Sequence, residues 1–505
     1  MTWSAATALG VLLALSLGLR LWARGGALLG YELVLPAHGL AAISTQPWGK
    51  VLLDGWWAWR DQPLSAPPGI LLSVVPGALA ALVPGRGWGI ACNLLMTVGA
   101  FALLLRATWW SAAGAAVLFA SLLTSNPMLS MAVSGFSRIT GIVAHCLALW
   151  IILRLRRSPW ATLGATVALL VLVPQLYDSG KLVVATFAVA VVTVRGARWQ
   201  SRVLWMLFAM ILGGAVVWVF PSQPVGWFLR FGNEPFTWSW RWATALPLEL
   251  WHREQLLPIL GGLALLGLRE ERPFLAGVWL AHAAWGIYQA ASPSRGAAGY
   301  RLLPWECYAT AILILRARRP LGLPPALKVA MGAAIVLQLW RLAAFVQTPP
   351  TIGHGNRYTI PEPPMAPGWD LAKPQVFRWE AAMLADVRAG RRIWVLYSFE
   401  CYDENYSAPL GVPENLYLAL GHERFVDSVV MFSDTRCRHA CLPFRPMKDL
   451  PGFVASTSGE WVAWDTQDCS SPEVDAQREV LARMPTRESS TVDQTRRALV
   501  NLGGP

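Results

Sequence analysis

Carboxylates are scarce in the first 347 residues of this chain, which restricts where acid–base chemistry can occur. Only ten aspartates and glutamates lie there, against twenty in the remaining residues. Three of the ten, Glu32, Asp54 and Asp61, fall within residues 24–88. Carboxylates are among the side chains that move protons in enzymes. The segment 24–88 is therefore the first place to look for a site.

Polar and aromatic residues follow one another in a definite order along this segment. Glu32 comes first, an apolar helix-like stretch carries His38, and Lys50 follows. A Trp-rich stretch contains Asp54, Trp56, Trp57, Trp59, Arg60 and Asp61. Pro67-Pro68-Gly69 then leads a further apolar run. Tryptophans of this kind commonly form a belt at the membrane surface. Stacking on a sugar is the alternative.

Two later segments also hold groups that could bind a ligand. Residues 294–304 carry Arg295 and Arg301, whose guanidinium forks suit phosphate oxygens but could equally anchor a helix end at the membrane surface. The Trp-rich segment 221–255 contains Glu234, which could line a pocket. Glu306 lies inside an apolar run, where an ionisable group needs a partner or water. Arg301 is its candidate partner.

The composition indicates the class of protein that must position these residues. Of 505 residues, 55% are apolar and 14% are charged, and the mean hydropathy is +0.42. A soluble globular protein carries about 25% charged residues. Disorder, a collagen-like fibre and a small disulfide scaffold are excluded, and an ordinary soluble enzyme is nearly so. The sequence predicts a polytopic membrane protein.

Apolar runs of roughly the length that crosses a bilayer, about 17–25 residues, recur through the first part of the chain. We expect about eleven transmembrane helices, with ten to thirteen as the range, because several runs are short or rich in Gly. They lie near residues 4–23, 89–105, 108–124, 139–153, 160–176, 182–194, 203–220, 256–268, 273–291, 302–315 and 326–346.

Arginines mark alternate connections between these runs. They are Arg106, Arg154, Arg156, Arg157, Arg195, Arg198, Arg202, Arg269, Arg272, Arg316, Arg318 and Arg319. Basic residues in short loops stay in the cytoplasm. The N-terminus is then inside, and the segment 24–88 and the C-terminal tail are outside. This assignment requires the apolar stretch Pro67–Pro84 to lie on the outer surface as a helix and not to cross.

The chain divides by charge and composition. Residues 1–347 form the predicted membrane domain and hold the basic excess, which is a topology signal and not a nucleic-acid footprint. Residues 348–376 form a linker rich in Pro, and 377–505 a soluble, extracytoplasmic α/β domain. Within it we expect helices at 378–389 and 473–484, strands at 393–399, 425–432 and 461–465, and a loose last ten residues.

Four of the seven cysteines lie in this tail: Cys401, Cys437, Cys441 and Cys469. Outside the membrane they would form two disulfides, in any of three connectivities. A metal site at Cys437, His439 and Cys441 is the disfavoured alternative, because the spacing matches no standard zinc pattern. A divalent cation elsewhere would need carboxylates to gather, and Glu32, Asp54 and Asp61 could do so only if the segment 24–88 folds back on itself.

The order of Glu32, the Pro-Pro-led run and Tyr300-Arg301-Leu302-Leu303-Pro304 resembles the membrane glycosyltransferases with the GT-C fold. The likeness is to the branch of protein mannosyltransferases and aminoarabinose transferases (glycosyltransferase family 39). That family has an acidic residue after the first span, a surface helix led by Pro-Pro-Leu, and an Arg-Tyr-Leu-Leu-Pro type segment before a late span. It commonly has about eleven to thirteen spans and a soluble outer domain.

The resemblance implies an inverting glycosyl transfer at the outer face of the membrane, from a polyprenyl-phosphate sugar to a glycan, lipid or protein acceptor of the cell envelope. Glu32 would be the general base for the acceptor. Arg295 and Arg301, with Lys50 and Arg60 behind them, would bind the donor phosphate. Asp54, Asp61, Trp56, Trp57, His38 and Glu234 are the other pocket candidates. The abundance of Ala, Leu, Arg and Trp favours a bacterial inner membrane.

Two other functions stay open. A transporter or flippase of lipid-linked material would share the apolar spans, although the long outer segment and soluble tail are less typical of one. A non-catalytic membrane subunit with a binding tail is the other. Tyr31-Glu32 stands where the family commonly has an Asp-Glu pair, which keeps this second alternative open. The sugar, the acceptor and the oligomeric state do not follow from the sequence.

Overall fold

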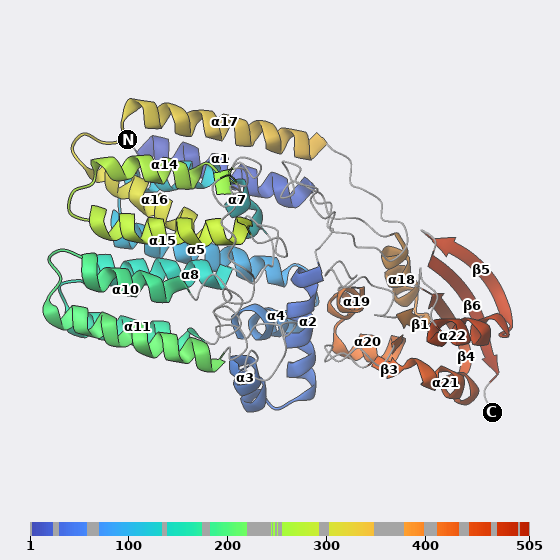
Figure 1. Ribbon diagram of the computed structural model, residues 1–505. Coiled ribbons are helices and arrows are strands. Elements are labelled where there is room, and N and C mark those ends of the chain that lie inside the picture. The colour runs from blue at the N-terminus through green and yellow to red at the C-terminus, as the bar shows by residue number, and fades with distance from the viewer. Residues whose placement is uncertain are drawn as a thin grey trace.

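The computed structural model describes residues 3–23, 30–57, 70–133, 139–173, 182–219, 244, 246–247, 250, 255–291, 302–347, 378–397, 412–433, 444–465, 472–492 and 495–503. Two parts are visible in Figure 1: a bundle of roughly parallel helices, and a smaller part that contains a sheet. Helix α2 (Gly30–Thr45) lies across the end of the bundle, between the two parts. The N-terminus lies at the opposite end of the bundle.

Every predicted apolar run contains a helix. The bundle helices are α1 (Trp3–Ala23), α5 (Trp88–Thr108), α6 (Ala112–Leu123), α7 (Asn126–Ala132), α8 (Ile139–Leu149) with a π-helical extension (Trp150–Arg154), α9 (Pro159–Val171), α10 (Val183–Thr193), α11 (Trp199–Val219), α14 (Leu257–Ala264), α15 (Arg272–Ala291), α16 (Leu303–Arg318) and α17 (Pro325–Gln347). Within the described ranges, four helices are long and apolar enough to span a membrane by themselves, or five if the bent pair α6–α7 counts as one span. Helix length therefore does not establish eleven spans.

Helix α16 lies at the centre of the bundle. Each of its residues from Leu303 to Arg316 is buried, and it packs against α14, α6, α15 and α8. The crossing with α14 is close, because a Cβ at Gly261 would lie 2.6 Å from the Cβ of Ala309. Small residues at such crossings let helix backbones approach each other. The side chains of α16 from Leu303 to Arg316 are therefore enclosed by protein.

The arginine-bearing connections after α5, α14 and α16 meet at one end of the bundle. Arg319 forms an ion pair with Glu271 at 2.5 Å, and Arg318 donates to the carbonyl of Thr108 at 3.3 Å. Figure 1 shows that this is the end away from the sheet. The basic connections and the sheet-containing tail thus lie on opposite sides of the bundle.

The segment between α1 and α5 builds the other end of the bundle. It contains α2, α3 (Trp48–Trp57), a π-helical turn η1 (Ile70–Val74) and α4 (Val75–Leu82). Helices α3 and α4 lie beside α2, and both η1 and α4 pack against it (Figure 1). Pro76 lies just after the junction where the π-helical turn η1 continues directly into α4.

The tail contains a six-stranded sheet in the order β3-β2-β1-β4-β6-β5. Strands β1 (Arg392–Tyr397), β2 (Val429–Ser433), β3 (Phe444–Pro446) and β4 (Ser458–Asp465) are parallel, whereas β6 (Thr495–Gly503) runs antiparallel to β4 and to β5 (Thr486–Val492). Helices α18 (Arg378–Arg388), α19 (Val412–Leu420) and α20 (His422–Ser428) share one apolar core with the sheet. Helices α21 (Leu450–Ser456) and α22 (Pro472–Ala482) share the other.

Two expectations for the tail are wrong. The predicted strand at 425–432 begins only at Val429, because His422–Ser428 forms a helix with Phe425 buried in the first core. The last ten residues are not loose through their length, since β6 covers residues 495–503. Its residues Val500 and Leu502 are buried, and the strand pairs along the whole of β4.

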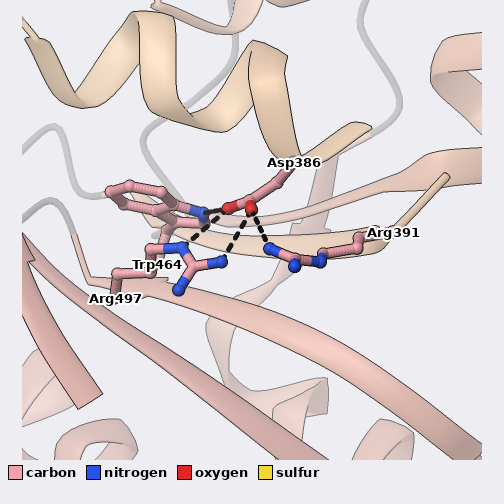
Figure 2. Close-up of polar contacts among 4 residues, drawn as sticks. All are labelled: Asp386, Arg391, Trp464 and Arg497. Atoms are coloured by element: carbon pink, nitrogen blue, oxygen red, sulfur yellow. Dashed lines mark hydrogen bonds and ion pairs between the residues drawn. The ribbon is translucent and has the colours of Figure 1, made fainter. Parts of the chain in front are cut away.

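A buried carboxylate joins helix α18 to two strands of the sheet (Figure 2). Asp386 of α18 is 5% exposed and forms a two-pronged ion pair with Arg497 of β6, at 2.9 and 2.7 Å. Arg391 donates to the same carboxylate at 2.8 Å, and the indole of Trp464 at 3.3 Å. Hydrogen bonding to Asp386 raises the pKa of the Arg497 guanidinium, so this cation stays charged at any ordinary pH. Strands β4 and β6 are thereby joined to α18.

Candidate functional site

Helix α2, which carries residue 32, is held at very short range by the turn η1 and α4. A Cβ at Gly39 would lie 1.9 Å from the carbonyl oxygen of Ser73, and one at Gly77 would lie 2.4 Å from the backbone nitrogen of Leu40. No larger residue fits either position without movement of the backbone. The Ser73 hydroxyl also donates to the carbonyl of Leu35 at 2.8 Å. These contacts fix α2 at the end of the bundle.

The two sides of α2 face different parts of the molecule. Leu35 belongs to the core of the bundle together with Leu72, and Gly39 contacts η1. Ala37, Leu40 and Ala41 instead belong to the core of the tail. Residue 32 lies in the first turn of the same helix, which begins at Gly30.

Lys50 and Asp54, predicted as separate ligand-binding groups, pair with each other on α3. The Lys50 ammonium donates to Asp54 at 2.9 Å and to Gln46 at 3.2 Å, and both charged side chains are more than half exposed. An exposed pair one helical turn apart adds little to stability. His38 of α2 is buried.

Several predicted site residues lie beyond what the structure describes. Glu32, Trp56 and Trp57 lie in helices, but their side chains are not described. Residues outside the described ranges are Arg60, Asp61, Glu234, Arg295, Arg301, Cys401, Cys437, Cys441 and Cys469. The convergence of Glu32, Arg295 and Arg301 on one cavity therefore stays a prediction. Among the described residues there is no disulfide, and Cys92, Cys146 and Cys307 are free thiols.

The carboxylate of Glu306 forms a polar centre in the bundle. Glu306 lies in the first turn of α16 and is fully buried. The Ser125 hydroxyl donates to its Oε2 at 2.5 Å, and the amide of Gln255 donates to its Oε1 at 2.9 Å. A buried carboxylate is stable only when hydrogen bonds replace its lost water. The Ser125 and Gln255 side chains provide such bonds.

Both donors lie next to helix ends. Ser125 lies between α6 and α7, whose axes differ by 97°, and its hydroxyl also accepts a hydrogen bond from the N–H of Met128 as the cap of α7. Gln255 precedes α14, which begins with Leu257. Sequence reasoning recognised that Glu306 needs a partner but did not identify either residue. The Ser125-Asn126-Pro127 turn signal was the available clue to the break.

A second polar group surrounds Tyr308, two residues further along α16. Its hydroxyl lies 2.7 Å from His145 Nδ1 and 2.6 Å from the Thr186 hydroxyl. The ring of His282 contacts that of Tyr308 at a tilt and that of His145 edge to face, and its Nδ1 lies 2.9 Å from the carbonyl of Val278. Both histidines are buried and hydrogen-bonded within the bundle. No group of three or more His, Cys, Asp or Glu residues suited to a metal occurs among the described residues.

The fold resembles solved structures of ArnT from Cupriavidus metallidurans, an aminoarabinose transferase with the GT-C fold. Against apo ArnT the TM-score is 0.50 at 14% identity, with 99% of this chain and 100% of that chain covered. Against ArnT bound to undecaprenyl phosphate the TM-score is 0.49 at 15% identity, with 99% of each chain covered. No protein-family profile and no curated protein matches the sequence.

The likeness to apo ArnT extends over both the bundle and the tail. At this identity it establishes the fold and not the activity. The GT-C architecture expected from the short sequence motifs is thereby confirmed, as a polytopic membrane protein with a C-terminal sheet-containing domain.

Proposed function

We propose that this protein is an inverting membrane glycosyltransferase that uses a polyprenyl-phosphate sugar as donor. One observation carries the proposal: in a GT-C fold, the helix with Glu32 lies across one end of the bundle. A lipid-linked donor held among the spans would present its sugar at that end. The apolar helices provide the surroundings that a polyprenyl chain requires.

In this proposal Glu32 is the general base. It takes the proton of an acceptor hydroxyl or amine as the acceptor attacks the anomeric carbon and the bond to the lipid phosphate breaks. A single displacement from the face opposite the phosphate inverts the configuration of that carbon. A positioned base typically contributes about 10²–10⁴-fold in rate.

The leaving group is an anionic lipid phosphate, which needs cations. Arg295 and Arg301 are assigned to it, because guanidinium groups bind phosphate oxygens in pairs. Lys50 and Arg60 are assigned behind them. Since Lys50 pairs with the exposed Asp54, it would have to exchange this partner for the phosphate.

The proposed orientation is that the arginine-rich end of the bundle faces the cytoplasm. The segment 24–88 and the tail then lie on the outer side of a bacterial inner membrane. The opposite location of the basic connections and the sheet supports this.

Two disulfides in the tail belong to the same proposal. Cys401, Cys437 and Cys469 each follow the last residue of a strand, β1, β2 or β4, by four positions. These three strands are adjacent and parallel, so their carboxyl ends share one edge of the sheet. An oxidising compartment would favour disulfides there.

The test is transfer by the purified full-length protein in lipid nanodiscs, with radiolabelled polyprenyl-phosphate sugars and a membrane acceptor fraction. The expected result is a labelled product with the anomeric configuration inverted. Movement of labelled lipid across a vesicle membrane without transfer would favour a flippase and contradict the proposal. A product with retained configuration would contradict the single displacement but would still support transferase activity.

Double substitution of the arginines separates phosphate binding from the other steps. Arg295→Ala with Arg301→Ala is expected to lower transfer by about 10²-fold or more, since each guanidinium stabilises charge on the leaving group. Arg483→Ala is the matched control, because Arg483 lies exposed just after α22 and pairs with Glu479. Equal transfer rates for the double variant and the control would contradict the assignment of Arg295 and Arg301 to the donor phosphate.

A further inference from the structure

The tail is packed directly against α2. Helix α19 runs along α2, and α20 also contacts it. Ala37, Leu40 and Ala41 of α2 are almost fully buried in the same apolar core as Leu416 and Leu420 of α19. These α2 residues recur at the three- and four-residue spacing of one helix face. The tail therefore packs on this face of the helix.

A polar contact fixes the alignment of this interface. The Arg86 guanidinium, in the connection between α4 and α5, donates to the side-chain oxygen of Asn415 at 3.1 Å. Asn415 is buried at the start of α19. The first residue before α20, Gly421, lies beside Pro84, since a Cβ there would be 3.6 Å from the proline ring. The two contacts join α19 and α20 to the segment that holds α2.

Helix α2 depends on outside contacts to remain ordered. It is 16 residues long and contains Pro36, which cannot donate a helical hydrogen bond to the carbonyl of residue 32. A proline in the interior of a helix costs about 3 kcal/mol, and most helical stability in proteins comes from tertiary packing. Without the tail, Ala37, Leu40 and Ala41 would lose most of the apolar core that covers them. The η1 and α4 contacts would then hold α2 on one side only.

We propose that the tail positions α2 for the reaction, with Leu416 and Asn415 as positioning residues that act through this helix. This inference rests on the proposed function, because Glu32 belongs to α2. The tail supports the face of this helix that carries Ala37, Leu40 and Ala41. Displacement of α2 would move Glu32 without any change in the chemical groups of the site.

The experiment compares two leucine-to-alanine variants of the full-length protein in nanodiscs. Leu416→Ala opens the interface with α2, whereas Leu481→Ala opens the other core of the tail, which has no residue from α2. Hydrogen exchange is measured at the amides of residues 37–45. Leu416→Ala is expected to raise their exchange by about tenfold, and Leu481→Ala to leave them unchanged. Equal exchange in both variants overturns the proposal.

Transfer kinetics give the second measurement. Leu416→Ala is expected to lower kcat by about tenfold while the KM for the lipid donor stays within about twofold, because orientation of the base and not donor binding is lost. Leu481→Ala should retain the kcat of the wild-type protein per folded molecule. A fall in kcat that is the same in both variants overturns positioning through α2.

If Leu416→Ala fails to fold, two milder substitutions at Asn415 replace it in the experiment. Asn415→Ala removes the acceptor for Arg86, whereas Asn415→Asp keeps one. We expect faster exchange in α2 and lower kcat for the first, with both restored in the second. Failure of the aspartate to restore either would contradict the proposal.

If the wild-type protein transfers no sugar at all, the proposed function fails, and exchange in α2 alone then decides the role of the tail.

Discussion

Two buried carboxylates show how differently the bundle and the tail stabilise charge. Asp386 in the tail accepts hydrogen bonds from two guanidiniums and an indole. Within the described part of the bundle, Glu306 accepts from the hydroxyl of Ser125 and the amide of Gln255, both of which are buried. In the tail, cations join separate strands and helices by charge pairing. In the described part of the bundle, neutral donors near helix ends reach the acid.

The largest effect is expected for Asp386→Ala. It leaves Arg497, whose side chain is 14% exposed, without its two-pronged partner. Removing one member of a buried pair costs about 3–5 kcal/mol. The unfolding free energy of the tail, from hydrogen exchange of β4 and β6 in the full chain, should fall by this amount. Asp386→Asn keeps the size of the side chain and one acceptor oxygen but removes the charge, so it should lose nearly as much. Recovery of most of the stability by asparagine would mean that packing and neutral hydrogen bonding, and not charge pairing, dominate here.

A smaller effect is expected for Glu306→Ala. It leaves the Ser125 hydroxyl and the Gln255 amide without this acceptor, and each such loss costs about 1–3 kcal/mol. Glu306→Gln keeps a carbonyl oxygen and should recover more than half of the lost stability in a thermal melt in detergent. If glutamine is as damaging as alanine, the negative charge itself is required, and the contrast with Asp386 disappears.

The smallest effect is expected for Arg391→Ala. Its side chain is 44% exposed although it contacts the buried Asp386. Water screens such a pair, and Arg497 remains in place, so the loss should stay below about 1 kcal/mol. The same exchange experiment on β4 and β6 measures it. A loss as large as that of Asp386→Ala would show that the two guanidiniums act as one unit.

The pattern of apolar residues predicted the fold well because membrane helices can be recognised from their local composition. Each predicted run contains a helix, and the short motifs pointed to the GT-C fold. Span counting was weaker because α6 bends at Ser125 and α14 ends in a 3₁₀ turn at Leu265–Gly267. Such breaks depend on caps and neighbouring helices, which a hydropathy window does not register.

Long-range contacts explain the remaining misses. The strand at 495–503 is stable because it pairs with β4, a partner about forty residues earlier along the chain. Phe425 suits a strand by propensity, but it faces α19 from a helix. Likewise the scarcity of acids identified Glu306, whereas Ser125 and Gln255 reach it only through folding. Candidate residues could be predicted from composition, but their partners could not.

The most direct test of the central claim is the transfer rate of Glu32→Gln relative to the wild-type protein, per folded molecule, in the same nanodisc assay. Glutamine keeps the size of the side chain but cannot take the acceptor proton, so the rate should fall by about 10²-fold or more. Glu479→Gln, an exposed carboxylate of α22, is the control and should be unchanged. A Glu32→Gln rate equal to that of the control would contradict the account.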